Sequence, residues 1–403
     1  MSPTRNERLL LAGDGLSAFG SWIDFLAILT LAAYQFHVTS YEMAVVSAAG
    51  LLPGMLLSPW IGRLCDKGNP RNMLLLSIGG RVLATAGILL CHDYVVFLAL
   101  VGLRSVFASV APPAINVMAV ECVAAKRRPR FYSVLNVLNN SAKVLAPAIG
   151  TVSSSLASES FALAMSLVFS LGALVVFACV RLAVKPAVAD ANAASPTATP
   201  ATLHTRELAP LIWVAATCAF FIFMVNNLVP LVLQQSGFDK ALLGVLVSCS
   251  GAGNILSGLW LAKRSASHAP RGDIGEMILP ATLQALGFGA TGYLLWLKPS
   301  HAALLLPMLF FVIGTFSARY AIAMNVHVAT HFAGTVGRVW GVLQAWQNAM
   351  ILVAPMIGAA VLDALGAGWL FAFSTGSALL SFALFYALRA GGIPRLQVSR
   401  SPG

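Results

Sequence analysis

Charged residues are scarce in this sequence. Of its 403 residues, only 10% are Asp, Glu, Lys or Arg, whereas 58% are hydrophobic. Soluble globular domains contain about 25% charged residues, and a chain this apolar has too little polar surface to cover several separate cores. The composition therefore excludes an ordinary soluble protein and predicts a polytopic membrane protein. At about 20 residues per helical span plus short loops, the chain has room for roughly a dozen spans.

Cysteine is also sparse, and several chemical signatures are missing. The six cysteines stand singly in or beside apolar runs, so we interpret them as small buried hydrophobes and not as a disulfide framework or metal site. No Gly-x-x-x-x-Gly-Lys-Ser/Thr sequence is present, which argues against ATP as the energy source. His327 and His331 have the spacing of a zinc-protease helix, but Val328 occupies the position of the catalytic Glu and no third ligand is evident. We therefore expect no metal, no cofactor and no enzymatic activity.

Twelve apolar segments predict an all-α membrane protein with twelve transmembrane helices. Their approximate limits are residues 9–36, 42–64, 71–91, 94–122, 131–157, 160–183, 209–235, 240–263, 274–297, 301–329, 337–363 and 367–390. The longest polar interval is rich in Ala, Pro and Thr, as a flexible linker would be. The expected organisation is an N-terminal six-helix bundle (1–184), a cytoplasmic linker (185–208), a C-terminal six-helix bundle (209–390) and a cytoplasmic tail (391–403).

The net charge of +11 does not indicate a nucleic-acid partner, because the basic residues cluster in the short breaks between apolar segments. Short loops rich in Lys and Arg remain in the cytoplasm. With the N-terminus inside, nineteen of the 25 Lys and Arg residues are cytoplasmic and only Lys240 and Lys298 lie on the opposite side. Four more fall within apolar segments, namely Arg81, Arg104, Lys143 and Arg319. We expect a multi-pass protein of a bacterial-type inner (plasma) membrane, with both termini in the cytoplasm.

The two halves of the chain repeat. A shift of 208 residues lays RFYSVLNVLNNSAKVLAPAIG, residues 130–150, on RVWGVLQAWQNAMILVAPMIG, residues 338–358. Arg, Val-Leu, Asn, Ala-Pro and Ile-Gly coincide in order. Because each half contains six spans, the two copies point the same way across the membrane, as in a parallel repeat about the membrane normal. Two bundles should then face each other across a central cavity.

Six plus six helices joined by a central cytoplasmic linker resemble the major facilitator superfamily over nearly the whole chain. The strongest local match is GRLCDKGNPR, residues 62–71, which is similar to the superfamily's Gly-x-x-x-Asp-Arg/Lys loop. The resemblance implies a cytoplasmic gate that latches the outward-facing state through Gly62, Asp66, Lys67 and Arg71. Asn69 and Pro70 depart from the usual pattern. In the second half, Ala262 stands where the Asp would be, so only one latch is intact.

Three weaker features carry the resemblance further. Arg104 resembles a buried arginine that is implicated in proton coupling in antiporters of the superfamily. The APAIG ending at 146–150 is similar to an exporter signature and implies helix bends at Pro147 and Gly150, repeated at Pro355 and Gly358. The opening LSAFGSWID, residues 16–24, resembles the branch of macrolide-efflux and siderophore-export carriers.

Buried polar residues form stripes in two of the segments. In the first, Asp14, Ser17, Ser21, Asp24 and Gln35 fall within an arc of about 80° at 100° per residue. Charged groups in lipid are costly, so this stripe should line the cavity or meet a partner. In the fifth, Lys143 lies roughly 20 Å from Arg130 at 1.5 Å per residue, near the membrane midplane. A buried Asp24–Lys143 pair is possible, and it could be a static bridge or part of a transport cycle.

Proton coupling requires a carboxyl group whose protonation changes during the cycle, and burial favours such a change near neutral pH. Asp24 is the first candidate and Asp14 the second, and the resemblance implies Arg104 as a third. Capping or pairing with a basic loop residue is an alternative for Asp14. Arg81 is either a packing bridge between helices or a contact for cargo.

The charges within the segments number four positive and two negative, which favours an anionic or zwitterionic cargo. Arg104 and Arg319 lie in the fourth and tenth segments, where they could hold carboxylates or phosphates from two sides. Hydrogen bonding between helices is the alternative role for the amides. The candidate cargo-binding residues are Arg104, Arg319, Lys143, Asn116, Asn136, Asn226, Asn227, Asn325 and Gln344.

The sequence thus predicts a secondary carrier with alternating access, most simply a proton-coupled exporter in contact with the lipid bilayer. Its cargo would be a small organic anion or zwitterion such as a carboxylate siderophore, or a hydrophobic drug. A lysophospholipid or glycolipid carrier and an organic-anion uptake permease remain alternatives. A membrane enzyme or non-transporting receptor is a further alternative, but no residues are arranged for chemistry at one membrane face beyond the histidine pair.

Overall fold

The computed structural model describes residues 4–36, 38, 40–156, 159–180, 205–226, 228–238, 240–264, 273–297 and 302–390. This part of the chain is helical and contains no strand. The linker predicted at 185–208 therefore lies largely outside the described residues, and the tail at 391–403 lies wholly outside them.

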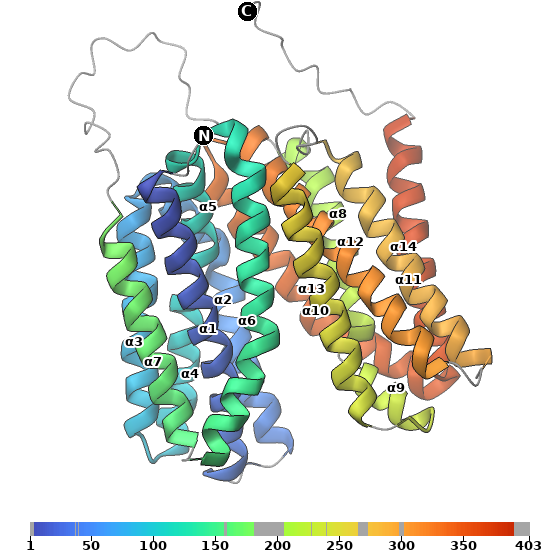
Figure 1. The fold of residues 1–403 in the computed structure, drawn as a ribbon, viewed down its shortest axis with the longest axis horizontal. Helices are drawn as coiled ribbons and strands as arrows, with labels where there is room; N and C mark the ends of the chain where they lie inside the picture. Colours follow the sequence, from blue (N-terminus) through green and yellow to red (C-terminus); the bar gives the residue numbers. More distant parts are fainter. Residues whose placement is uncertain are drawn as a thin grey trace, which may run out of the picture.

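The helices form two groups that stand side by side (Figure 1). The N-terminal bundle contains α1 (Arg5–Tyr34), α2 (Ser40–Lys67), α3 (Pro70–Leu90), α4 (Tyr94–Ala108), α5 (Ala111–Cys122), a 3-10 turn (Ala125–Arg127), α6 (Arg128–Leu156) and α7 (Glu159–Ala178). The C-terminal bundle contains α8 (Thr205–Asn226), α9 (Val229–Gln235), α10 (Lys240–Arg264), α11 (Gly275–Leu297), α12 (Ala302–His331), α13 (Val336–Leu365) and α14 (Ala367–Ala390).

The predicted all-α membrane fold is confirmed. Within the described residues, eleven stretches are long and apolar enough to cross a bilayer, and α4 with α5 makes up one of them. The 29-residue helix α6 is not among these stretches, and counting it as a span would give the twelve that the sequence predicts. The starts of α6 and α13 are separated by 208 residues, the offset of the sequence repeat.

Two predicted continuous helices are broken, and proline accounts for both breaks. The segment expected at 94–122 divides into α4 and α5 at Ser109 and Val110, because Pro112 and Pro113 lack the N–H that a continuing helix needs. The segment expected at 209–235 divides into α8, which ends at Asn226, and α9, which begins at Val229 just before Pro230. Proline is tolerated in the first turn of a helix, so each break starts a new helix.

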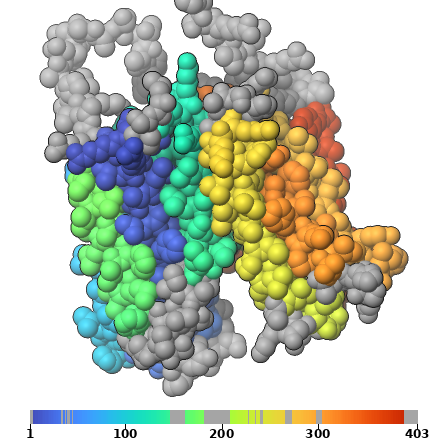
Figure 2. All heavy atoms as spheres, in the orientation of Figure 1, coloured from blue at the N-terminus to red at the C-terminus, as the bar shows by residue number. Residues whose placement is uncertain are grey.

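The two bundles touch at one side of the molecule, which we name the basic side. It carries the start of α1, the turn between α2 and α3, and the starts of α6 and α13, and it lies at the top of Figure 1. From there the bundles diverge, and Figure 2 shows a hollow between them at the lower end. The seam between α2 and α13 is tight because a Cβ on Gly62 would collide with the carbonyl of Gly337.

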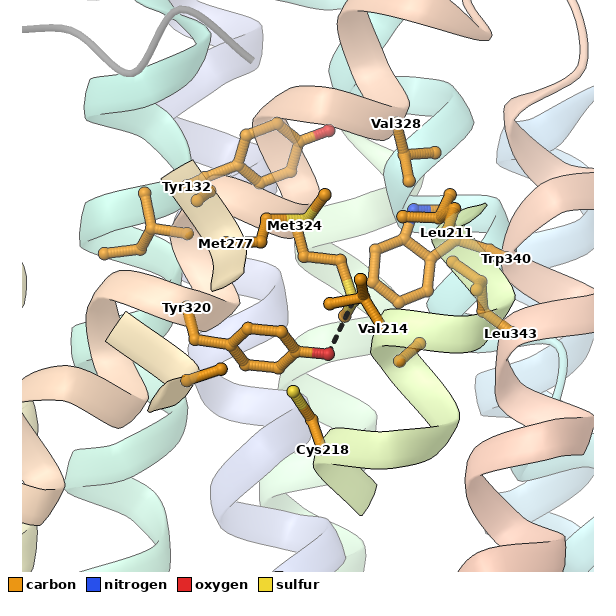
Figure 3. Close-up of a cluster of buried hydrophobic side chains, with 14 of the residues drawn as sticks. Tyr132, Leu211, Val214, Cys218, Met277, Tyr320, Met324, Val328, Trp340 and Leu343 are labelled. Atoms are coloured by element: carbon orange, nitrogen blue, oxygen red, sulfur yellow. Dashed lines mark hydrogen bonds between the residues drawn. The ribbon is translucent and has the colours of Figure 1, made fainter. Parts of the chain in front are cut away.

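A shared hydrophobic core lies close to the basic side. Figure 3 shows Tyr132 of α6 near Met324 of α12, with Trp340 of α13 and Leu211 of α8 in the same cluster. The Tyr320 hydroxyl donates to the Met324 sulfur at 3.4 Å. Residues of both bundles thus bury apolar surface together at this side, which keeps it closed.

Candidate functional site

A polar cavity lies inside the N-terminal bundle. It has a volume of about 280 Å³ and is bounded by residues of α1, α3, α5 and α6 together with Ala108 at the end of α4. Three members of the polar stripe on the first helix, Asp14, Ser17 and Ser21, face this cavity. The polar and aromatic lining residues are Asp14, Ser17, Ser21, Trp22, Arg81, Asn116 and Asn139.

Arg81 of α3 crosses to α1 at this cavity. Its guanidinium donates to the hydroxyls of Ser17 at 3.2 Å and Ser21 at 2.5 Å. The side chain is buried, and its Nε has no hydrogen-bond partner among the described residues. The guanidinium is held by hydroxyl groups, and the same cavity wall carries the Asp14 carboxyl group, so groups of both signs face this cavity.

Asp24 is paired with Arg104, and not with Lys143 as the sequence suggested. Arg104 of α4 donates through Nε to Oδ2 of Asp24, and the Thr85 hydroxyl donates to the same oxygen at 3.1 Å. All three residues are buried. The Oδ1 atom of Asp24 is buried without a partner among the described residues.

The other two predicted charges of the site lie on either side of this pair. The Asp14 carboxylate accepts a hydrogen bond from the Asn139 amide at 2.7 Å, so it joins α1 to α6. Lys143 is exposed, and its ammonium lies 5.8 Å from the centroid of the Trp22 ring. A lysine ammonium is attracted to an aromatic face at this distance.

The charges inside the N-terminal bundle balance. Asp14 and Asp24 carry two negative charges, and Arg81 and Arg104 carry two positive charges. The excess of positive charge that the sequence indicated is therefore absent from this cluster and resides on Lys143 and Arg319, outside it. A balanced cluster of both signs suits a zwitterion at least as well as an anion.

Most of the candidate amides hydrogen-bond to protein. Asn116 donates to the Pro112 carbonyl at 2.9 Å but leaves its Oδ1 buried and unpartnered within the described structure. Asn136 donates to Asn254 of α10 at 2.7 Å, which links the two bundles. Asn325 donates to the Ala321 carbonyl of its own helix at 2.8 Å. Of these three, only Asn116 lines the polar cavity.

The remaining candidates lie elsewhere. Asn226 is exposed at the end of α8, and Asn227 lies outside the described residues. Gln344 on α13 has a buried Oε1 without a partner among the described residues. Arg319 does not join Arg104. Its guanidinium lies 5.2 Å from the Trp260 ring and 5.8 Å from the Phe316 ring, within the C-terminal bundle.

Asp66, which the resemblance implied as a latch, contacts α13 of the other bundle. Its two carboxylate oxygens accept the backbone N–H groups of Gly337 at 2.6 Å and Arg338 at 2.8 Å. These groups belong to the first turn of α13, where N–H groups lack partners in the helix and the helix dipole favours an anion. Gly62 allows the close approach of α2, because a Cβ there would meet the Gly337 carbonyl.

The other two residues of the motif have different positions. Lys67 is exposed at the end of α2. Arg71 donates to the carbonyl of Ala178 at 2.5 Å, at the end of α7, and so stays within the N-terminal bundle. The latch across the bundles therefore consists of Asp66, with Gly62 making room for it.

Sequence reasoning missed Arg128, which joins the bundles on the opposite flank of the basic side. It donates to the carbonyls of Val120 at 2.9 Å, in the last turn of α5, of Val123 at 3.3 Å, just after that helix, and of Ala329 in α12 at 2.9 Å. A cation at the ends of two helices satisfies carbonyls that have no partner in the helix. The only signal in the sequence was the run KRRPR at 126–130, which indicated a cytoplasmic loop and nothing more.

The predicted helix bends remain predictions. α6 continues through Pro147 and Gly150, whose side-chain surroundings lie outside the described residues. α13 likewise continues through Pro355 and Gly358. Gly358 allows α13 to approach α8, since a Cβ there would meet the Met224 carbonyl.

A family model described as Major Facilitator Superfamily matches residues 10–318. The chain belongs to this superfamily. It is a multi-pass membrane transporter and not an enzyme. A superfamily relative of Bacillus subtilis (strain 168), described as the uncharacterized MFS-type transporter YfiS, is 26% identical over 371 residues, covering 89% of this chain and 87% of that protein.

Solved structures of the superfamily share the fold. A bacterial homologue of the iron transporter ferroportin in an outward-facing state has a TM-score of 0.75 at 13% identity, covering 96% of this chain and 100% of that one. The human organic anion transporter MFSD10 (TETRAN) has a TM-score of 0.69 at 17% identity, covering 95% and 100%. The proton:xylose symporter XylE has a TM-score of 0.74 at 13% identity, covering 95% of each chain. At these identities the similarity shows the fold alone.

Proposed function

We propose that this transporter couples the movement of a small organic anion or zwitterion to protons, with Asp24 as the proton-binding residue. The observation that carries the proposal is the buried ion pair of Asp24 and Arg104 beside a polar cavity. Ionisable groups are rarely left inside a membrane domain without a function, because their burial is costly. The pair joins α1 to α4, so its breaking and forming can accompany a movement of these helices.

Protonation would weaken the pair in a simple way. A proton on the unpartnered Oδ1 neutralises the Asp24 carboxyl and removes the charge that holds Arg104. The released guanidinium then needs another anion, and the neighbouring cavity offers space for the carboxylate of a cargo molecule. Proton and cargo would thus compete for Arg104, which is the relation expected of an exchanger that moves them in opposite directions.

We further propose that the basic side faces the cytoplasm of a bacterial-type inner membrane. The excess of Lys and Arg in its loops supports this orientation. The latched basic side and the hollow on the other side would then correspond to an outward-facing state. From this state a protonated Asp24 could carry its proton inward, in the direction of export driven by the proton gradient.

The volume and the charged residues of the cavity limit the size and charge of the cargo. A volume of about 280 Å³ suits a small molecule, and the wall offers both a guanidinium and a carboxylate. We therefore favour a zwitterion or a carboxylate, of which a carboxylate siderophore is one example, over a hydrophobic drug. The human relative of similar fold is an organic anion transporter, which accords with this cargo class. Uptake of the same cargo and carriage of a lysophospholipid or glycolipid are the competing possibilities.

The test is transport in proteoliposomes with Asp24→Asn. A panel of carboxylates and zwitterionic amino acids would be assayed for exchange without a pH difference and for accumulation with one. We expect the variant to keep exchange within a few-fold of the wild type and to lose accumulation driven by the pH difference. Asp93→Asn is the matched control, because Asp93 is an exposed cap of α4 and Asn caps equally well.

The outcomes separate the alternatives. Accumulation by Asp24→Asn at the wild-type level would remove Asp24 from the coupling mechanism. Accumulation on the side opposite to export would favour an uptake permease. Movement of a fluorescent lysophospholipid that does not respond to the pH difference would favour the lipid carrier.

A further inference from the structure

Arg319 lies within the membrane span of α12 without an acidic partner. The two ion pairs found in the described part of the chain are Asp24–Arg104 and Glu7–Arg127, and neither involves it. Its Nε is buried without a hydrogen-bond acceptor among the described residues. The guanidinium rests on the Trp260 ring at 5.2 Å, and the guanidinium of Arg264 lies 4.6 Å from the same ring.

The direction in which Trp260 points follows from the contacts of α10. Gly251 and Gly258 meet α6, since a Cβ on either would contact Val144 or Val137 of that helix. Trp260 is nine residues beyond Gly251 and two beyond Gly258, which places it about 180° and 200° around the helix at 100° per residue. Because α6 belongs to the N-terminal bundle, Trp260 points away from the opposite bundle and away from the space between the two.

Exposed apolar residues share this outer face. On α12, Met308 and Val312 lie eleven and seven residues before Arg319, within about 20° of it around the helix. Both are exposed, and so is Leu256, four residues before Trp260 on α10. Figure 2 shows α10 and α12 side by side on the outer surface, in yellow and orange. In a bilayer these side chains face lipid, so the guanidinium of Arg319 reaches the lipid as well.

Trp260 lies near the level of the lipid head groups, whereas Arg319 lies deeper, twelve residues before the end of α12. Trp260 is four residues from Arg264 at the end of α10, or about 6 Å at 1.5 Å per residue. Tryptophan prefers the interface between hydrocarbon and head groups. Arginine extends its stem through apolar surroundings and places its charge in the same layer. Lys263 is exposed, three residues from Trp260, and adds a further charge at this level.

We propose that Arg319, Trp260, Lys263 and Arg264 form a binding site for the phosphate of an anionic phospholipid in the leaflet of the basic side. The guanidinium of Arg319 donates to the phosphate oxygens, and Lys263 and Arg264 add attraction from the helix end. The acyl chains lie along Leu256, Met308 and Val312. A lipid is favoured over a free phosphate ion because the face between the charges and the membrane centre is apolar.

The site also explains why a costly charge faces the hydrocarbon. Basic pockets between helices near the cytoplasmic surface are where anionic head groups bind. None of the proton-coupling residues belongs to this lipid site. Loss of lipid binding and loss of proton coupling can therefore be observed separately.

The test is lipid binding by the purified full-length protein in detergent. Dioctanoyl phosphatidylglycerol, dioctanoyl phosphatidylcholine and inorganic phosphate would be titrated, with bound lipid counted by native mass spectrometry. We expect the wild type to bind phosphatidylglycerol in preference to the other two. Arg319→Leu should raise its apparent dissociation constant about ten-fold, and Trp260→Leu about three-fold.

Two further variants complete the design. Lys263→Gln changes an exposed residue and should weaken binding about three-fold without affecting folding, so the test does not depend on Arg319→Leu being well folded. Lys126→Gln is the matched control, because it removes one exposed charge from the basic side away from the site and should bind as the wild type does. Equal binding of phosphatidylglycerol by wild type, Arg319→Leu and Lys263→Gln would overturn the proposal. Equal binding of phosphatidylcholine or inorganic phosphate by the wild type would overturn it as well.

Discussion

At the scale of single residues, the N-terminal bundle depends on charge balance. Arg81 lines the same cavity as Asp14, and the two interact electrostatically. Arg81→Gln leaves the bundle with one excess negative charge and leaves the Ser17 and Ser21 hydroxyls without their donor. Leaving a buried charge without its partner costs about 3 kcal/mol, less where water reaches the site. We expect a clearly lower midpoint of thermal unfolding in detergent.

Restoring neutrality should restore part of that stability. The double variant Arg81→Gln/Asp14→Asn keeps as many negative as positive charges in the cluster. Its loss of folding free energy should therefore be smaller, by about 1 kcal/mol, than the sum of the losses in the two single variants. The same thermal scans measure this. Arg63→Gln, which removes an exposed charge from α2, is the control and should change little. Strictly additive losses would show that the two charges do not interact.

The residue scale also shows where sequence reasoning stopped. The spacing of Asp14, Ser17, Ser21 and Asp24 located a polar stripe, and the structure gives each of these residues a polar contact. The spacing did not identify the partner of Asp24, because residue counting gives the depth of a side chain but not the helix that it faces. Lys143 was the candidate by depth, and the structure instead places the Arg104 guanidinium of α4 on the Asp24 carboxylate.

At the scale of helices, glycine determines how closely α10 and α12 pack. A Cβ on Gly253 would meet the carbonyl of Phe311, and backbone cannot move aside as a flexible side chain can. Gly253→Ala should therefore separate the two helices and destabilise the C-terminal bundle by about 1 to 3 kcal/mol. Gly244→Ala is the matched control in the same helix, because nothing lies within 4 Å of its Cβ position. It should be neutral or stabilising by up to about 1 kcal/mol.

Thermal unfolding in detergent distinguishes the two variants. An equal effect of both alanines would show that helix propensity, and not the close approach, controls this seam. Helix limits were largely predictable because apolar runs and the turns between them are local properties of the sequence. The breaks before α5 and at α9 were missed although Pro112, Pro113 and Pro230 mark them, because the apolar run continues past each proline.

At the scale of the whole molecule, two charged residues hold the bundles together at helix ends. One is an acid at a helix N-terminus, and the other is an arginine at helix C-termini. Asp66 binds the first turn of α13, and Arg128 binds carbonyls in the last turns of α5 and α12. The resemblance pointed to Asp66 as a gate residue, because its motif is local in the sequence, although it did not name α13 as the helix contacted. The sequence could not predict the second contact, since Val120 and Ala329 meet Arg128 only after the bundles have closed.

Cys65 offers a native probe of this closure. It is 0% exposed, and it lies against Gly337 across the seam, so a maleimide reaches it only when the basic side opens. In a variant that retains Cys65 and replaces the other five cysteines by alanine, Asp66→Ala removes two hydrogen bonds to a carboxylate. If the two hydrogen bonds together stabilise the closed basic side by about 2 kcal/mol, their removal should raise the rate of Cys65 alkylation in nanodiscs about thirty-fold. Arg63→Ala, an exposed neighbour on the same helix, should leave the rate unchanged.

Arg128→Gln tests whether the second contact is an independent latch. The variant removes the guanidinium from three carbonyls, so the alkylation of Cys65 should again rise, by about ten-fold for a loss of roughly 1.4 kcal/mol. Arg130→Gln is the matched control, since Arg130 is exposed two residues away. If both latches hold one closed state, the effects of Asp66→Ala and Arg128→Gln multiply in the double variant, because either contact alone lowers the free energy of the same closure. A double variant that alkylates no faster than Asp66→Ala would mean that Arg128 only caps helices, and that Asp66 alone keeps the basic side shut.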